Sequence, residues 1–163
     1  MKDNSHKTAI TRKELSRPIR DFREHVKGRV LDFGCGKGSD ADILGADKYD
    51  PHFFPEKPKG LYDTVLCTYV LNTTFFPKDV LKRVCEYVKP GGTIIVSTRS
   101  ITEVNKAAKK GNWAEYRGGY LTGKKTFQRG LSVASLIDMF SEEFTVRHTE
   151  QSPYTLIIAE RLV

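Results

Sequence analysis

Residues 30–38 read Val30-Leu31-Asp32-Phe33-Gly34-Cys35-Gly36-Lys37-Gly38, and this stretch decides the fold. An apolar run carries one acid and then opens into three glycines at alternate positions. Glycine tolerates positive φ, and it has no Cβ to hold a ligand away from the backbone. The pattern therefore predicts a buried strand followed by a loop against a ligand, where a nucleotide-binding α/β fold has its first strand.

The spacing of these glycines narrows the ligand. The dinucleotide fingerprint is G-x-G-x-x-G and the phosphate loop is G-x-x-x-x-G-K-[ST], whereas this loop reads G-x-G-x-G. Asp32 lies two residues before the first glycine, where a carboxylate would repel a phosphate and attract an ammonium group. We therefore expect a cofactor with an adenosine and an amino group, and S-adenosylmethionine meets both requirements.

A second acid, Asp50, follows Asp32 by 18 residues. An acid about 20 residues after the first one, at the tip of the second strand, is placed to accept hydrogen bonds from ribose hydroxyls. The alternative is that Asp50-Pro51 is only a turn, since both residue types favour turns. With another strand expected downstream, the spacing favours cofactor binding.

Composition is that of an ordinary soluble protein, since 39% of the 163 residues are hydrophobic and 29% are charged. The length predicts one domain, residues 1–163. Residues 1–8 show no signal-peptide pattern, and the longest aliphatic run, Ile94-Ile95-Val96, is too short to span a membrane. We therefore expect a cytoplasmic protein that makes no membrane contact.

Cysteine and charge content bear on possible partners. The three cysteines form no C-x-x-C pair, so we expect neither a disulfide framework nor a metal site. Cys35 is either a small buried filler of the glycine loop or, if a base lies beside it, a nucleophile. The net charge of +7 hints at a polyanionic partner, although basic charge also serves solubility.

The order of expected elements predicts an α/β fold with a mostly parallel sheet covered on both faces. A loose N-terminal cap, residues 1–28, carries a helix that starts at Thr11 or at Ser16 and ends by Gly28. Residues 51–62 hold three prolines and leave no room for a full strand and helix, so an edge strand is reduced or missing. The remaining expected elements are strands at 30–33, 47–50, 65–70 and 93–98, helices at 39–44, 77–88 and 132–140, and a closing antiparallel pair at 144–148 and 154–159.

Ligands in such sheets bind outside the carboxyl ends of the strands. Residues 32–38, 50–52 and 69–72 all fall at that edge, so we expect them to form one site. Residues 99–130 form an insertion rich in basic and aromatic side chains, which either face a nucleic acid substrate or belong to a solvated hairpin whose aromatics pack on the core. The substrate-binding candidates are Lys110, Trp113, Tyr116, Arg117, Lys124, Lys125 and Arg129.

Residues 30–100, from VLDFGCGKG through YDTVLCTYVLN to VKPGGTIIVSTR, resemble the class I S-adenosylmethionine-dependent methyltransferases, whose Rossmann-like sheet is the expected fold. A closer resemblance, to the methyltransferases associated with DNA phosphorothioation systems, rests on five stretches. These are HKTAITRKELSRPIR (6–20), LDFGCGKGSD (31–40), YDPH (49–52), YVLN (69–72) and TFQRG (126–130).

The resemblance implies a set of cofactor contacts. The three glycines would let the backbone approach the cofactor, and Asp32 would lie near its amino group. Asp50 would accept hydrogen bonds from its ribose hydroxyls. Pro51 and His52 would border the adenine, and Arg12 would pair with the carboxylate or be a solvated arginine. The full implied set is Arg12, Asp32, Gly34, Cys35, Gly36, Gly38, Asp50, Pro51, His52, Thr68, Tyr69 and Val70.

Residues 68–72 read TYVLN and lack both the Asp/Asn-Pro-Pro-aromatic and the Pro-Cys motifs of base-methylating enzymes, so neither standard base chemistry is indicated. The catalytic candidates are His52, Asn72 and Tyr69, although Asn72 could instead cap the next turn. We expect a methyltransferase acting on nucleic acid or a nucleotide. The alternatives are a small-molecule methyltransferase and a cofactor-binding module that needs a partner protein.

Overall fold

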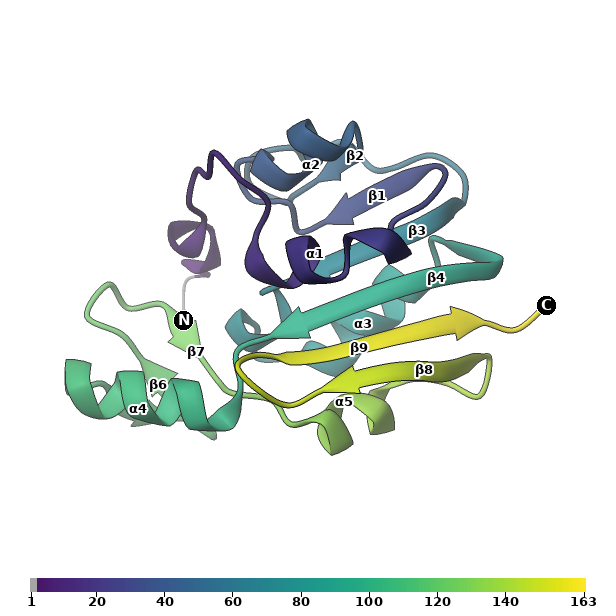
Figure 1. The fold of residues 1–163 in the computed structure, drawn as a ribbon. Coiled ribbons are helices and arrows are strands. Elements are labelled where there is room, and N and C mark those ends of the chain that lie inside the picture. Colours follow the sequence, from purple (N-terminus) through teal and green to yellow (C-terminus); the bar gives the residue numbers. More distant parts are fainter. Residues whose placement is uncertain (1–2) are drawn as a thin grey trace.

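A computed structural model describes residues 3–163 and contains two sheets (Figure 1). The larger has the strand order β2-β1-β3-β4-β9-β8, and the smaller has the order β5-β6-β7. The strands of the larger sheet are β1 (Val30–Phe33), β2 (Asp47–Tyr49), β3 (Tyr62–Thr68), β4 (Val88–Thr98), β8 (Phe144–Glu150) and β9 (Thr155–Arg161). The helices are η1 (Ser5–Thr8), α1 (Arg17–Asp21), η2 (Arg23–His25), α2 (Ser39–Leu44), η3 (Leu71–Thr73), α3 (Pro77–Cys85), α4 (Ile101–Gly111) and α5 (Val133–Met139).

The expected fold class is confirmed. Strands β2, β1, β3 and β4 pair in parallel, and β9 and β8 continue the sheet as an antiparallel pair. The carboxyl ends of the four parallel strands therefore lie along one edge, where the glycine loop follows β1.

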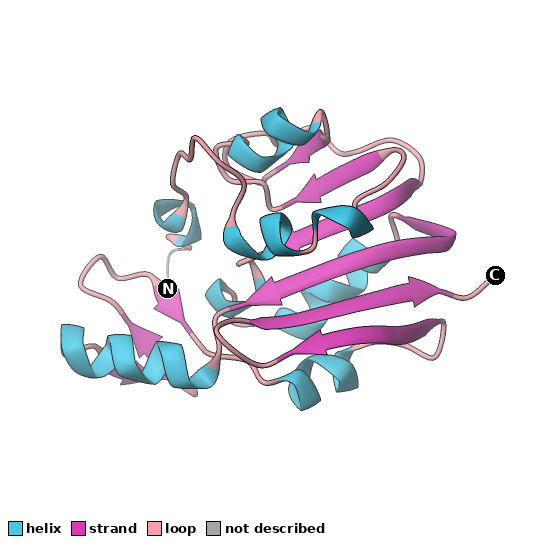
Figure 2. Cartoon of the chain, in the orientation of Figure 1, coloured by secondary structure: helices cyan, strands magenta, loops and turns pink. Residues whose placement is uncertain are grey.

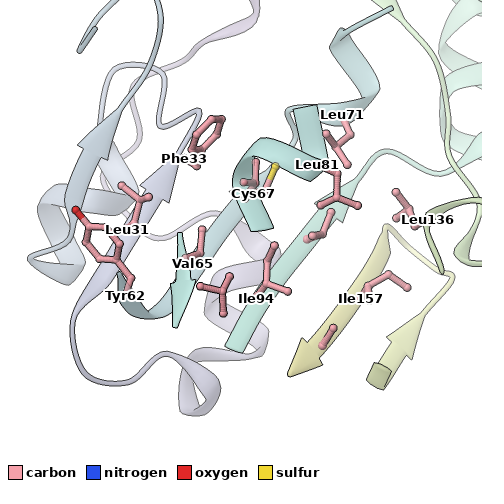
Figure 3. Close-up of a cluster of buried hydrophobic side chains, with 14 of the residues drawn as sticks. Leu31, Phe33, Tyr62, Val65, Cys67, Leu71, Leu81, Ile94, Leu136 and Ile157 are labelled. Atoms are coloured by element: carbon pink, nitrogen blue, oxygen red, sulfur yellow. The ribbon is translucent and has the colours of Figure 1, made fainter. Parts of the chain in front are cut away.

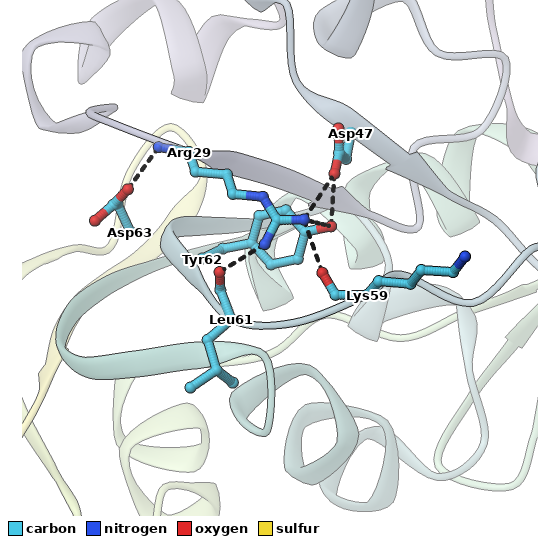
Figure 4. A network of polar contacts seen from close by, with 6 residues as sticks. All are labelled: Arg29, Asp47, Lys59, Leu61, Tyr62 and Asp63. Carbon is cyan, nitrogen blue, oxygen red and sulfur yellow. Dashed lines mark hydrogen bonds and ion pairs between the residues drawn. The ribbon is translucent and has the colours of Figure 1, made fainter.

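The predicted loss of an edge strand is also confirmed. Between β2 and β3 the chain makes only one isolated bridge, Asp50 to Phe54, and β1 pairs directly with β3. Arg29 fastens this connection at the far end of the sheet, donating to the carbonyls of Lys59 (2.7 Å) and Leu61 (2.9 Å) (Figure 4). Its guanidinium also lies 4.1 Å from the ring centroid of Tyr62.

Alternating side chains along the central strands build a core on each face of the sheet. Val65, Cys67 and Ile94 join the cluster under α3 and α5, which Figure 3 shows. Leu66 and Ile95 point the other way, into the cluster that includes Ile19 of α1. Because both faces are covered, ligands reach the sheet at its strand ends.

Several boundaries differ from expectation. The N-terminal helix expected to end by Gly28 already ends at Asp21, and the short helix η2 follows it. Strands β3 and β4 begin at Tyr62 and Val88, earlier than the expected residues 65 and 93. The start at Ser16 is correct and the start at Thr11 is wrong, because α1 begins at Arg17 with Pro18 in its first turn, where a missing N–H costs nothing. Helix α3 ends at Cys85, and the backbone from Val88 onward belongs to β4, where Val88 pairs with Tyr62. Strand β3 ends at Thr68, two residues early, because the chain turns sharply at Tyr69.

Residues 99–130 form a small lobe beside the carboxyl ends of the strands (Figures 1 and 2). Ser100 caps the start of helix α4, because its hydroxyl accepts a hydrogen bond from the Glu103 N–H. The lobe's sheet consists of β5 (Ala114–Tyr116), β6 (Gly119–Leu121) and β7 (Phe127–Gln128).

Candidate active site

A cavity of about 800 Å³ lies at the carboxyl ends of β1, β2 and β3. Its wall combines the glycine loop, the turn after β2, the end of β3 with η3, and part of α3. Residues from the N-terminal segment and from the lobe complete it. The three expected stretches, 32–38, 50–52 and 69–72, each contribute to this one cavity.

The glycine loop turns tightly around the end of β2. Gly34 and Cys35 both donate their N–H to the carbonyl of Tyr49, at 2.7 and 3.0 Å. Gly34 has φ +79°, and a Cβ there would overlap Val70 Cγ2. Gly36 has φ +57°, and its Cβ would lie 3.1 Å from the Cβ of Ala9. Both positions therefore require glycine for conformation as well as for space.

Gly38 has a different role from the other two glycines of the loop. Gly34, Cys35 and Gly36 line the cavity, whereas Gly38 does not. It is the N-cap of α2 with φ +85°, and a Cβ would lie 3.1 Å from the Lys48 side chain. Lys48 in turn forms an ion pair with Asp42 of α2, so Gly38 makes room for a contact that fixes the helix to β2.

Asp32 is the buried acid of the site. Asp32 is the residue before the last in β1 and is 3% exposed. Burial raises the pKa of Asp32 to about 8, and the nearby carboxylates of Asp40 and Asp50 add to the effect. A cationic group bound in this cavity would favour the ionised carboxylate.

Asp50 organises the turn after β2. One carboxylate oxygen accepts from Gly36 N (3.0 Å), and the other accepts from His52 N (2.9 Å) and Phe53 N (3.0 Å). Asp50 therefore stabilises a turn, as the alternative interpretation predicts, and it also lines the cavity. A carboxylate has about four acceptor positions, so Asp50 retains capacity for a ligand hydroxyl.

The end of β3 passes under the cavity. Tyr69 adopts φ +56°, which is uncommon for a residue with a side chain. Thr68, Tyr69 and Val70 all line the cavity, and Thr68 Oγ1 is buried with no hydrogen-bond partner among the described residues. Burial raises the pKa of the Cys35 thiol to about 12, which favours the neutral thiol over the thiolate.

The N-terminal segment, residues 3–12, forms part of the cavity wall. His6 stacks on His52, with ring centroids 4.0 Å apart and planes 13° apart. Arg12 lines the cavity, and its backbone N–H donates to Ser39 Oγ at 2.9 Å. Pro51 and His52 line the same side. The predicted adenine edge is thus covered by residues from the start of the chain.

The opposite wall was not predicted, apart from Asn72. Asn72 Nδ2 donates to Gln128 Oε1 (3.0 Å), so Asn72 does not cap the turn. Arg99 and Glu103 lie next to them and also line the cavity. The signal that could have found Gln128 is TFQRG, a polar stretch whose Thr126 and Gln128 are both buried.

The seven substrate-binding candidates of the lobe do not line the cavity. Lys110, Arg117, Lys124 and Lys125 are exposed to solvent. Tyr116 packs on Phe75, with ring centroids 5.9 Å apart. Trp113 lies near Arg99 and Tyr120, whereas the guanidinium of Arg129 lies 6.0 Å from the Phe127 ring. The aromatic side chains of the lobe thus contact one another and Phe75, and the exposed cations form a surface outside the cavity.

Residues 3–163 contain neither a cluster of metal ligands nor a membrane-spanning helix. No group of three or more His, Cys, Asp or Glu side chains in that range could hold a metal ion. No helix in the same range is long and apolar enough to cross a membrane.

Comparisons with solved structures agree with the fold. One similar structure is an S-adenosylmethionine-dependent methyltransferase of Thermotoga maritima, described as a possible histamine N-methyltransferase (TM-score 0.63, 17% identity, 89% of this chain and 86% of that one). Magnesium protoporphyrin IX methyltransferase of Synechocystis, solved with bound SAH, is also similar (TM-score 0.57, 17% identity, 88% and 78%). So is the 1,6-didemethyltoxoflavin-N1-methyltransferase of Burkholderia thailandensis (TM-score 0.57, 16% identity, 82% and 71%).

Sequence comparison identifies the family. No curated protein matches the sequence at a significant level. The profile of the family described as "Methyltransferase domain" matches residues 8–140, which include every segment that lines the cavity from Thr8 to Gln128. This chain belongs to that methyltransferase domain family.

Proposed function

We propose that this chain is an S-adenosylmethionine-dependent methyltransferase whose acceptor is small enough to enter the cavity, as a free small molecule or a single nucleotide. The observation that carries the proposal is the meeting of the glycine loop, Asp32, Asp50 and the end of β3 at one cavity. A buried acid, Asp32, and a half-buried acid, Asp50, beside a loop of positive-φ glycines suit a ligand that carries both an amine and a ribose.

The residues present fit this cofactor. Asp32 faces its amino group, and Asp50 uses its remaining acceptor capacity for the ribose. Pro51 and His52 border the adenine, and Arg12 pairs with the carboxylate. Thr68 Oγ1, buried without a partner, gains one from the bound ligand. When bound, S-adenosylmethionine supplies an electrophilic methyl group.

Cavity size and position favour a small acceptor. A volume of about 800 Å³ lies within the range of about 300–1,000 Å³ for small-molecule sites. The N-terminal segment forms part of the cavity wall, and the basic side chains of the lobe lie outside the cavity. Catalysis then rests on holding the acceptor in line with the methyl group, with His52, Tyr69 and Asn72 as the candidate side chains that face it.

A nucleic acid acceptor is the second candidate, and the exposed cations of the lobe favour it. Lys106, Lys109 and Lys110 project from α4, and Lys124 and Lys125 lie on the β6–β7 connection. Such a surface binds phosphates with a steep salt dependence. This second candidate includes two further proposals: that the chain is related to the DNA-phosphorothioation-associated methyltransferases, and that it is located in the cytoplasm. If duplex DNA and RNA fail to bind even at low salt, the second candidate is wrong.

Calorimetry with S-adenosylmethionine tests the cofactor site. Asp50→Ala should weaken binding by about tenfold or more, because hydrogen bonds to charged groups contribute about 1.5–3 kcal/mol. The control is Asp79→Ala, which removes an exposed acid of α3 that does not line the cavity. Unchanged affinity in Asp50→Ala would contradict the ribose assignment.

Transfer of labelled methyl groups into fractionated cell extract then separates the acceptor classes. Label in small-molecule fractions supports the first candidate, and label in DNA or RNA supports the second. Cofactor binding without transfer to any fraction would favour a module that needs a partner protein.

A further inference from the structure

Four polar side chains from three parts of the chain form one hydrogen-bonded row on the wall opposite the glycine loop. Asn72 lies in η3, Gln128 in β7, Glu103 in α4, and Arg99 between β4 and α4. Arg99 Nε donates to Glu103 Oε1 (3.0 Å), and Arg99 Nη1 lies 3.5 Å from Gln128 Oε1. Asn72 Nδ2 donates to the same Gln128 oxygen at 3.0 Å. All four residues line the cavity.

Arg99 fixes the direction of every bond in this row. A guanidinium has five donors and no acceptor, so Gln128 must present its oxygen to Arg99 rather than its amide nitrogen. That oxygen also receives the Asn72 amide nitrogen, so the orientation of the Asn72 side chain follows. Asn72 Oδ1 is therefore the atom of this amide that has no partner in the row. Exchanging Oδ1 and Nδ2 would place two acceptor oxygens, Asn72 Oδ1 and Gln128 Oε1, against each other.

Asn72 Oδ1 has no partner of its own. Asn72 is 1% exposed, and Oδ1 is buried without a hydrogen bond to any described residue. Buried carbonyl groups without partners are rare in native proteins, and each calls for a physical explanation. A turn-capping role does not supply one, because η3 has no side-chain cap. An acceptor atom held in a fixed direction beside a ligand cavity instead suits a donor on the ligand.

We propose that Asn72 Oδ1 accepts a hydrogen bond from an N–H or O–H group of the methyl acceptor. Gln128, Arg99 and Glu103 are positioning residues that fix the orientation of the Asn72 side chain in the cavity wall. The inference rests on the proposed function and deepens it, because it names the substrate class: molecules with a polar N–H or O–H at the end that enters the site. Acceptors that lack such a hydrogen leave Asn72 unpaired and are disfavoured.

Matched pairs of small probes test this without knowledge of the natural acceptor. The pairs are aniline and N,N-dimethylaniline, benzimidazole and 1-methylbenzimidazole, and phenol and anisole. Each is titrated by NMR into the full chain saturated with S-adenosylhomocysteine. In the wild type, the N–H or O–H member of at least one pair should bind at least about fivefold tighter than its methylated partner.

Three variants separate a positioned acceptor atom from general packing. Asn72→Leu removes the oxygen and should abolish the preference. Gln128→Leu leaves Asn72 in place but frees its amide to rotate, so it should also abolish the preference, and it serves if Asn72→Leu does not fold. Gln128→Glu keeps an acceptor oxygen for both Arg99 and Asn72, so it should retain the preference.

The outcomes decide the inference. Absence of a preference in the wild type, absence of binding by every probe, or a preference that persists in Asn72→Leu and Gln128→Leu would each overturn it. If S-adenosylhomocysteine itself does not bind the wild type, the proposed function fails and this inference fails with it. If S-adenosylhomocysteine binds normally and the probes show no preference, only the role of Asn72 fails.

Discussion

Binding of S-adenosylmethionine should release a proton from Asp32, and this provides a direct test of the electrostatics of the site. In the free protein, burial and two neighbouring carboxylates raise the pKa of Asp32 to about 8, so about nine in ten molecules carry it protonated at pH 7. A cationic ligand beside it favours ionisation. We therefore expect uptake of the cofactor at pH 7 to release close to one proton.

The affinity should follow the same linkage. Below pH 8 the association constant should rise about tenfold for each pH unit, as long as the pKa of Asp32 in the complex lies below the pH of the measurement. Above pH 8 this contribution should level off, because Asp32 is then ionised before the ligand binds. Between pH 6 and pH 8 the expected limiting increase is about 50-fold, because about half of the Asp32 carboxyls are still protonated at pH 8.

The assay is titration calorimetry at pH 6, 7 and 8 in buffers of different ionisation enthalpy, which gives the number of protons released. Asp32→Asn keeps the shape of the side chain and removes its titration, so protons from the ligand's own amino group cancel in the comparison. The reasoning is refuted if wild type and Asp32→Asn release the same number of protons. It is also refuted if the two affinities change in parallel with pH.

Stability of the free protein has the opposite pH dependence. Because the native state binds the Asp32 proton more tightly than the unfolded state, the native state loses stability as the pH rises from about 4 to about 8. Above pH 8 this loss is complete. Asp32→Asn should unfold at a higher temperature than the wild type at pH 8, with the difference shrinking toward pH 4. A constant difference across this range would show that Asp32 does not titrate as described.

Two further predictions concern the loop and its cover. Gly34→Ala should lower the free energy of unfolding in urea by more than Gly45→Ala. Both positions have positive φ, which costs a residue with a side chain about 1–2 kcal/mol, but only at Gly34 would the new Cβ overlap Val70. Equal losses in the two variants would contradict the close approach of Gly34 and Val70. His6→Ala should speed cofactor dissociation in stopped-flow experiments, because the His6–His52 stack closes the site. Lys7→Ala, which removes a neighbouring exposed side chain, is the control, and equal rates in all three proteins would contradict a covering role.

Local sequence patterns predicted the cofactor side of the site because each part of it is encoded within a few residues. An apolar strand, alternating glycines and an acid at fixed spacing need no knowledge of the tertiary fold, and β1 matches residues 30–33 as expected. The opposite wall could not be predicted in this way. Arg99, Glu103 and Gln128 meet Asn72 only because α4 and β7 fold back on η3, and no periodic pattern marks that meeting.

The basic and aromatic candidates show a related limit. Basic and aromatic residue types predict contacts with phosphates and bases, but they do not specify which side of a short strand faces the cavity. Tyr116 packs on Phe75, a residue some forty positions earlier in the chain, and this contact has no local sequence signal. Within the same insertion, the residues that line the cavity are an arginine at its start, a glutamate in the first turn of α4 and a glutamine near its end.

The N-terminal cap and the reduced edge of the sheet are two parts of one arrangement. With no strand or helix between β2 and β3, the turn at Asp50 lies at the edge of the sheet and would otherwise face solvent. The start of the chain covers this turn instead: His6 stacks on His52, and Ala9 packs against Gly36. Helix η1 in this wall has no buried residue, and segments with few buried apolar contacts open at lower free energy than the core. Cofactor access is therefore expected to depend on the N-terminal segment, while the rigid strand ends keep the acids and Asn72 in place.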